Sequence, residues 1–258
     1  MDKFCYSIED EKTFYFDLPD SNGLHIKGLL RGGLNQPLAV IMHGRPGTGN
    51  ELLPYLAAHY LKEHGIASLR LFMYDFEPKA RNLIDCTLDT FANDFDEVIR
   101  QLRAKKVPKV FAIGHSYGGI TILKAKSKLD GAVLWDPTHG SYWIEHADEK
   151  DENFPEKTIG DLVIGTGGYG YVSSVKIDKY DKQMGDTTDW AANKGYPLMV
   201  ISAGNGAMTH LGKRYIEVSD DPKKHLVIEN AHHQLEDSDK VILQLLTETN
   251  NWLQKFTS

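Results

Sequence analysis

Short apolar runs alternate with amphipathic helical stretches along most of this chain, and this alternation restricts the fold more than any single motif does. Apolar runs of four to six residues are typical of strands that are buried on both faces, as they are in parallel sheets. Because parallel strands need crossover connections, usually helices, the pattern predicts an α/β fold with helices on both faces of a mostly parallel sheet. We expect residues 1–258 to form a single domain, since a chain of 258 residues can enclose one continuous core.

Eight strands and four long helices are expected from the pattern. The strands are expected at 14–18, 25–30, 38–42, 68–72, 109–113, 132–135, 198–202 and 225–228. The first two should form an antiparallel hairpin, because the segment 19–23 between them is rich in turn-forming residues. The helices are expected at 51–64, 87–104, 119–128 and 238–256.

The segment 138–196 is too long to be a simple connection between two strands. Connections beyond about 15 residues usually carry structure or function of their own. The segment contains several Tyr and Trp residues. Its glycine-rich part, 165–171, lacks the Lys-Ser/Thr pair of a phosphate-binding P-loop, which argues against a nucleotide site there.

Ser116 stands in the pentapeptide Gly-His-Ser-Tyr-Gly, residues 114–118, between an expected strand and an expected helix. In a G-x-S-x-G elbow the chain leaves a buried strand, turns sharply at the serine and enters a helix, so that the hydroxyl projects at the carboxyl end of the sheet. The pentapeptide alone is a weak signal. Its position between strand and helix makes Ser116 a candidate nucleophile.

Two histidines, His232 and His233, follow the last expected strand and precede the last expected helix. A serine nucleophile needs a general base that takes its proton, and histidine is the usual one. Taken alone, the pair could be two solvated loop histidines. Their position in the chain relative to Ser116 favours a catalytic role for one of them.

A third motif, His-Gly-Arg-Pro-Gly at residues 43–47, follows the expected strand 38–42. With the serine pentapeptide and the late histidine, it resembles the α/β-hydrolase superfamily of serine hydrolases, over residues 23 to 258. Residues 65–70 resemble the small esterase and acyl-peptidase-like branch, and the motif at 43–47 also resembles that of proline iminopeptidases. The resemblance implies that residues 138–196 form a cap or lid insertion over the nucleophile. The resemblance implies an oxyanion hole made by the amide of Tyr117 and that of Arg45 or Gly44. It also favours His233 over His232, because the family pattern I-x-G-A-x-H places its histidine at position 233.

The chain departs from the family pattern at the acid. The family's usual acid follows the strand expected here at 198–202, but residues 203–208 contain no carboxylate. Asp136 ends the expected strand 132–135, and some family members take their acid from that strand, so we predict Asp136 as the acid. An Asp-Pro pair can also simply start a turn. The alternatives are Asn205, no acid at all and, as weaker candidates, Asp186, Asp189, Asp220 and Asp221.

These residues predict a serine hydrolase that cleaves a carboxylic ester, or a thioester or amide, in a small-molecule acyl substrate. Ser116 would be the nucleophile, His233 the base and Asp136 its partner, without a metal or organic cofactor. The missing family acid motivates an alternative, a non-catalytic hydrolase-fold binding or receptor protein. Arg45 could meet an anionic group of the substrate, remain solvated or pair with a carboxylate of the cap.

Composition excludes several other classes of function. The net charge is −7 and the basic residues are dispersed, so no nucleic-acid-binding surface is indicated. No apolar run approaches the roughly 18 residues that a membrane span needs, and the first residues do not resemble a signal peptide. We therefore expect a cytoplasmic protein with no membrane partner, and leave the oligomeric state open.

Overall fold

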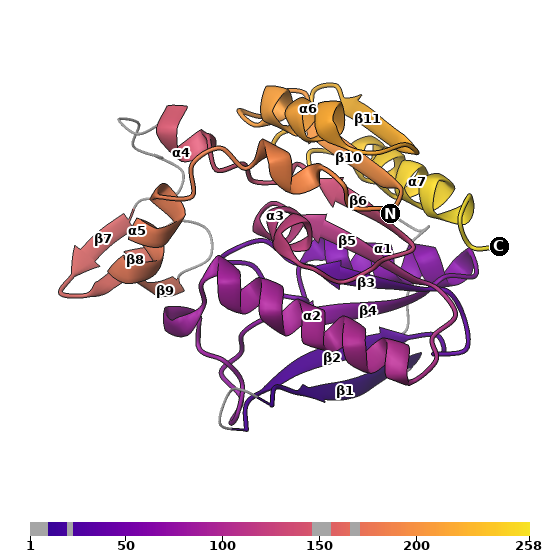
Figure 1. Ribbon diagram of the computed structural model, residues 1–258, viewed down its shortest axis with the longest axis horizontal. Helices are drawn as coiled ribbons and strands as arrows, with labels where there is room; N and C mark the ends of the chain where they lie inside the picture. The colour runs from indigo at the N-terminus through magenta and orange to yellow at the C-terminus, as the bar shows by residue number, and fades with distance from the viewer. Residues whose placement is uncertain (1–9, 20–22, 146–155, 166–170) are drawn as a thin grey trace.

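An eight-stranded sheet forms the centre of the computed structural model, which describes residues 10–19, 23–145, 156–165 and 171–258 (Figure 1). The strand order is β1-β2-β4-β3-β5-β6-β10-β11. All neighbouring strands are parallel except β2, which is antiparallel to both β1 and β4. The strands are β1 (Glu11–Asp17), β2 (His25–Arg31), β3 (Leu38–Met42), β4 (Ala67–Phe72), β5 (Val110–His115), β6 (Gly131–Trp135), β10 (Leu198–Ala203) and β11 (Lys223–Ile228).

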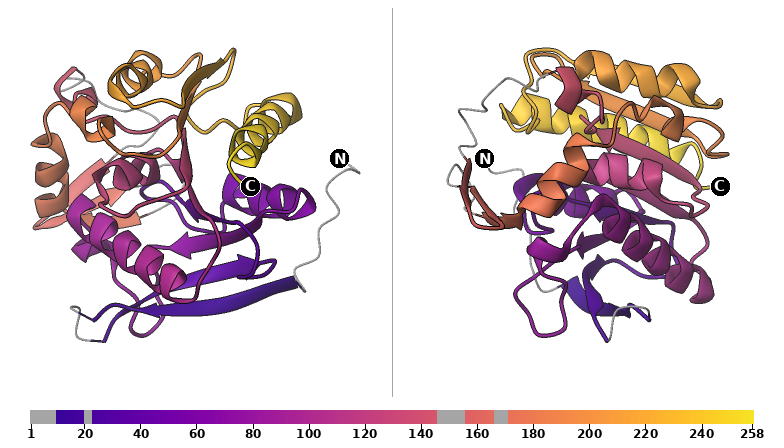
Figure 2. Two further views of the ribbon diagram at one scale, coloured as in Figure 1. Left: turned by 45° about the vertical axis from the view of Figure 1, so that its right-hand side comes forward. Right: turned by 60° about the vertical axis from the view of Figure 1, so that its left-hand side comes forward.

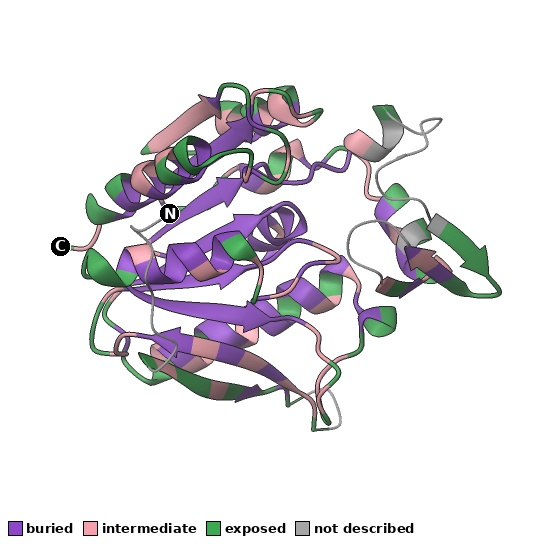
Figure 3. Ribbon diagram, turned by 180° about the vertical axis from the view of Figure 1, so that it is seen from behind, coloured by how far each residue is buried: buried purple, intermediate pink, exposed green. Residues whose placement is uncertain are grey.

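Helices cover both faces of the sheet (Figure 2). One core cluster packs α1 (Leu52–Glu63) and α7 (Asp239–Gln254) against the sheet, and the other packs α2 (Leu88–Ala104) and α3 (Tyr117–Lys124) on the opposite face. Every residue of β3, β4, β5, β6 and β10 is buried, whereas the edge strand β1 is largely exposed (Figure 3). Central strands enclosed by two helical layers must be apolar along their whole length, which is why the sequence shows them as continuous apolar runs.

The predicted fold class is confirmed, and the eight predicted strands lie within a few residues of those observed. The helix expected over 119–128 begins earlier, at Tyr117, and ends earlier, at Lys124. Asp96 of α2 explains the early end. Its carboxylate accepts hydrogen bonds from the N–H groups of Lys126 at 3.0 Å and Ser127 at 2.8 Å, which hold the chain outside the helix.

The helix α6 (Thr209–Val218) was not predicted. Its buried positions are Leu211, Gly212 and Tyr215, too few apolar residues to give a clear helical period. Gly212 lies close to β10, because a Cβ there would come within 2.5 Å of the Ser202 hydroxyl. The helix therefore depends on a close approach that the apolar pattern does not encode.

Between β6 and β10 the chain forms a small three-stranded antiparallel sheet that lies to one side of the large one (Figure 1). The elements of this insertion are α4 (Tyr142–Glu145), β7 (Glu156–Ile159), β8 (Leu162–Gly165), β9 (Tyr171–Ser174), α5 (Val175–Lys182) and the short 3-10 helix η3 (Thr188–Ala191). Most of the glycine-rich segment 165–171 lies outside the described residues. The role of the insertion as a cap stays a prediction. In the described ranges, no helix is both long and apolar enough to cross a membrane.

Candidate active site

Ser116 occupies the sharp turn between β5 and α3, with φ of 52° and ψ of −118°. A positive φ is unusual for a residue with a side chain and costs about 1–3 kcal/mol, so the surrounding structure must hold it. Two glycines make the turn possible. A Cβ on Gly114 would lie 2.6 Å from the backbone of Gly118, and one on Gly118 would lie 2.7 Å from the carbonyl oxygens of Met42 and His43.

The structure brings Ser116, His233 and Asp136 into one line of hydrogen bonds. His233 Nε2 lies 2.9 Å from Ser116 Oγ, and His233 Nδ1 lies 2.7 Å from Asp136 Oδ2. Since an ionised carboxylate can only accept, Nδ1 carries the proton and donates it to Asp136. The lone pair of Nε2 then faces Ser116, and the serine hydroxyl donates to it. This is the arrangement that a general base needs in order to take the serine proton.

Asp136 is fully buried at the end of β6 and is itself held by the neighbouring strand β10. Its second carboxylate oxygen accepts the N–H of Ala203 at 3.0 Å, and its own N–H donates to the carbonyl of Ile201 at 2.7 Å. Like Ser116, it has a positive φ, of 39°. Strand β10, which no carboxylate follows at 203–208, thus supplies backbone groups that fix Asp136 at the end of the neighbouring strand.

The alternative candidates lie elsewhere. The side chain of His232 is 68% exposed and its Nδ1 lies 2.6 Å from Asp237 Oδ1. Asn205 is exposed, and its backbone N–H donates to the carbonyl of Ala231 at 2.8 Å. Asp220 and Asp221 lie just before β11, at the amino edge of the sheet and away from Ser116.

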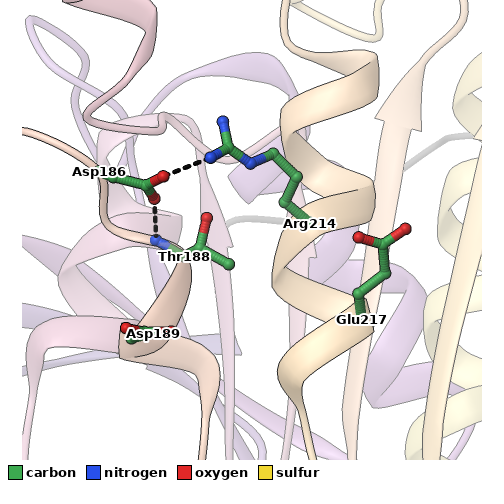
Figure 4. Close-up of a pocket in the computed structure, with 5 residues that line it drawn as sticks. All are labelled: Asp186, Thr188, Asp189, Arg214 and Glu217. Atoms are coloured by element: carbon green, nitrogen blue, oxygen red, sulfur yellow. Dashed lines mark hydrogen bonds and ion pairs between the residues drawn. The ribbon is translucent and has the colours of Figure 1, made fainter.

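Two further carboxylates, Asp186 and Asp189, line a polar surface cavity of about 360 Å³ that contains none of the three aligned residues (Figure 4). Asp186 pairs with Arg214 of α6 and accepts the N–H of Thr188 at 2.8 Å. The remaining carboxylate of the cavity is Glu217. Asp186 is therefore engaged in local contacts that do not reach His233.

The loop after β3 lies directly against the serine. A Cβ on Gly44 would be 3.1 Å from Ser116 Cβ. The next residue, Arg45, forms an ion pair with Asp181 of α5, with 2.5 Å between Nη1 and Oδ2. The Arg45 side chain therefore pairs with a carboxylate of the insertion, which is one of the three possibilities that the sequence left open.

Two buried histidines flank the site and are uncharged at neutral pH. Burial lowers the pKa of His43 and of His115 to about 4, and for His115 the nearby His233 lowers it further. His115 Nε2–H donates to the carbonyl of His233 at 2.9 Å. His43 Nδ1–H donates to the carbonyl of Gly44 at 2.6 Å. Each histidine therefore fixes the backbone of a loop that contacts Ser116.

Thr138 is a residue of the site that the sequence analysis missed. Its hydroxyl lies 3.3 Å from Ser116 Oγ, and its N–H donates to the carbonyl of Ser116 at 3.1 Å. The Tyr215 hydroxyl of α6 donates to the carbonyl of Thr138 at 2.9 Å. A signal was available, because Thr138 comes two residues after Asp136 and must emerge at the same edge of the sheet. Among the residues that the structure describes, no three His, Cys, Asp or Glu side chains gather as metal ligands.

The sheet order, the elbow and the placement of the histidine define an α/β-hydrolase fold, and comparison with solved structures shows the same. The chain is similar to Est1E from Butyrivibrio proteoclasticus, solved with ferulic acid bound, at 18% identity over 94% of this chain and 98% of that one, with a TM-score of 0.72. It is also similar to the esterase domain of a Rhodothermus marinus protein, at 17% identity over 96% and 99% of the chains, with a TM-score of 0.70.

A mammalian structure has the same fold. The mouse alpha/beta hydrolase domain-containing protein 10 is 13% identical over 95% of this chain and 99% of that one, with a TM-score of 0.71. No protein-family model matches the sequence, and no curated protein matches it. At these identities the similarity establishes the fold, and the chemistry must be argued from the site.

Proposed function

We propose that this protein is a serine hydrolase that cleaves carboxylic esters through an acyl-enzyme on Ser116. The observation that carries the proposal is the continuous hydrogen-bonded line from the buried Asp136 carboxylate through His233 to the Ser116 hydroxyl. The strained backbone of Ser116 adds support, since strain of this kind concentrates at functional sites.

In the first half of the reaction, Ser116 Oγ attacks the carbonyl carbon of the ester while His233 Nε2 takes the hydroxyl proton. The carbonyl π electrons move to its oxygen, and the resulting oxyanion is held by the amide of Tyr117 and that of Arg45 or Gly44. Tyr117 is the first residue of α3, where a helix N–H has no partner within the helix. When the oxyanion collapses, the bond to the alcohol breaks and the alcohol oxygen takes the proton from His233.

In the second half, water attacks the acyl-serine ester. His233 Nε2 removes a proton from the water, and the tetrahedral intermediate releases Ser116, which recovers its proton from His233. The products are a carboxylic acid and the free enzyme. Throughout, Asp136 keeps the proton on Nδ1 and stabilises the charged imidazolium. Apart from the ester and one water molecule, these steps use only groups of the chain.

We prefer an ester to a thioester or amide as the substrate because two of the solved structures with a similar fold are described as esterases or bind ferulic acid. Est1E, solved with ferulic acid bound, and the Rhodothermus marinus esterase domain share the fold over nearly the full chain. The alternative of a non-catalytic binding protein was motivated by the missing acid after β10. The hydrogen bond between Asp136 and His233 favours the enzyme over this alternative.

The test is covalent labelling with a fluorophosphonate together with hydrolysis of short p-nitrophenyl esters. We expect the wild type to be labelled and active, and Ser116→Ala to lose both properties while keeping its circular dichroism spectrum. Ser127→Ala is the matched control, since its half-buried hydroxyl contacts Asp96 of α2, beyond the end of α3 that is opposite Ser116. A wild type that is neither labelled nor active, or a Ser116→Ala variant that is still labelled, would contradict the proposal.

A further inference from the structure

One buried carboxylate of the insertion holds two residues that border Ser116. Asp181, on α5, has a side chain that is 2% exposed, and its Oδ2 lies 2.5 Å from Arg45 Nη1. Its Oδ1 accepts the hydroxyl of Tyr117 at 3.0 Å. The Arg45 guanidinium lies over the Tyr117 ring, 4.8 Å from its centre. Asp181, Arg45 and Tyr117 therefore form one buried cluster that joins the insertion to the loop after β3 and to the elbow.

The charges of this cluster depend on one another. Burial raises the pKa of Tyr117 well above its usual value and the nearby Asp181 raises it further, so the phenol stays protonated and donates. Burial alone would lower the pKa of Arg45, but the combined attraction of Asp181, the largest opposing cause, and of Tyr117 and Tyr171 offsets this, and the pKa is raised. Removing one member of a buried ion pair leaves the other charge without compensation, which is strongly unfavourable.

We propose that Asp181 is a positioning residue through which the insertion controls the oxyanion hole. This inference rests on the proposed function, in which the amide of Tyr117 and that of Arg45 or its neighbour Gly44 hold the oxyanion. Asp181 binds the side chains of Tyr117 and Arg45, so their backbone groups are fixed together only when α5 is docked. Hydrolysis then requires the docked insertion, and movement of α5 away from the elbow switches the site off.

The chain offers a matched control in the neighbouring residue of α5. The Tyr180 hydroxyl donates to Asp89 Oδ2 of α2 at 2.5 Å, and Asp89 also pairs with Lys124 at 3.0 Å. This contact also joins the insertion to the helices α2 and α3, but it does not involve Arg45 or Tyr117. The Asp89 side chain is 52% exposed, so its pairing is screened by water. Asp89→Asn therefore removes the charge from this docking contact, as Asp181→Asn does in the cluster, without touching Arg45 or Tyr117.

The experiment measures kcat and KM for a p-nitrophenyl ester, and the rate of fluorophosphonate labelling, in the wild type, Asp181→Asn, Tyr117→Phe and Asp89→Asn. Loss of one oxyanion donor typically costs about 10²–10³ in rate, and a donor that is displaced rather than lost should cost roughly 10–100-fold. We expect Asp181→Asn to lose roughly 10–100-fold in kcat and in labelling rate, with KM changed by less than about threefold. Tyr117→Phe, which keeps the amide, should lose less than Asp181→Asn, and Asp89→Asn should stay close to the wild type.

The possible failures are distinguishable. A wild type that is not labelled contradicts the proposed function, and this inference falls with it. A labelled wild type with a folded Asp181→Asn variant of equal rate overturns the inference alone, as does an equal loss in Asp89→Asn, which would indicate a general structural role. If Asp181→Asn does not fold, the double variant Arg45→Met with Asp181→Leu removes both charges together. That variant should show the same loss of kcat, and normal turnover in it would refute the positioning role.

Discussion

Replacing Asp136 by asparagine is expected to reduce kcat by about 10³–10⁴-fold, and the hydrogen bonds around the carboxylate explain why. One oxygen accepts the N–H of Ala203 at 3.0 Å, and the other accepts His233 Nδ1–H at 2.7 Å. An asparagine of the same shape has one oxygen and one NH₂ group. Because the backbone N–H of Ala203 can only donate, the amide oxygen of the asparagine must face it, and the NH₂ group must then face His233.

This orientation imposes the wrong tautomer on the base. The NH₂ group donates to Nδ1, so the imidazole proton moves to Nε2, which then cannot accept the hydroxyl proton of Ser116. Flipping the amide would restore the tautomer but would set its NH₂ group against the N–H of Ala203 in a fully buried place. Leaving buried donors unsatisfied costs about 3 kcal/mol, or roughly 10²-fold in population. Loss of the negative charge beside the imidazolium accounts for the rest of the expected loss in kcat of about 10³–10⁴-fold.

The assay is steady-state hydrolysis of a p-nitrophenyl ester, with nitrogen NMR of the His233 ring to identify the tautomer directly. We expect KM to change little, because Asp136 does not contact the substrate in the proposed reaction. Asn205→Ala is the control, since Asn205 was the other candidate for the acid position and is exposed. Turnover near normal in Asp136→Asn, or a comparable loss in Asn205→Ala, would refute the reasoning.

Three further outcomes are expected. His233→Ala should lose at least about 10³-fold in kcat while His232→Ala keeps most of it, and the reverse ranking in the same ester assay would transfer the role of base to His232. Thr138→Val should lose about tenfold in kcat, the equivalent of one hydrogen bond to Ser116, and Thr138→Ser should restore it; equal rates in both variants would show that the hydroxyl does not matter. Burial raises the pKa of Glu51, the residue before α1, from 4.5 to about 7. Its ionisation therefore lowers stability as the pH rises from about 4.5 to about 7, and Glu51→Gln should raise Tm at pH 8 but not at pH 5. A Tm difference that is the same at both pH values would contradict this.

Much of the fold follows from local sequence, because buried parallel strands must be apolar throughout and covering helices must carry an apolar face. The elbow could also be located, since Gly114 is required by the backbone of Gly118, four residues later. The contact that requires Gly118 itself, with the carbonyl oxygens of Met42 and His43, comes from the distant strand β3 and the loop after it. The helix α6 escaped prediction because it packs through a glycine and few apolar side chains. The early end of α3 depends on Asp96, which lies on another helix and acts through the backbone.

By itself, the sequence determined that Ser116, Asp136 and Asn205 reach the carboxyl edge of the sheet, because each closely follows or ends a strand and parallel strands all end at that edge. It could not determine which of these groups meet. That Asp136 rather than Asn205 faces His233 depends on the pairing of β6 with β10, whose backbone N–H at Ala203 orients the carboxylate. The partner of Arg45, Asp181, comes from an insertion more than a hundred residues later. The sequence does not reveal such contacts, because the packing of elements that are distant along the chain decides which charged side chains are buried beside one another.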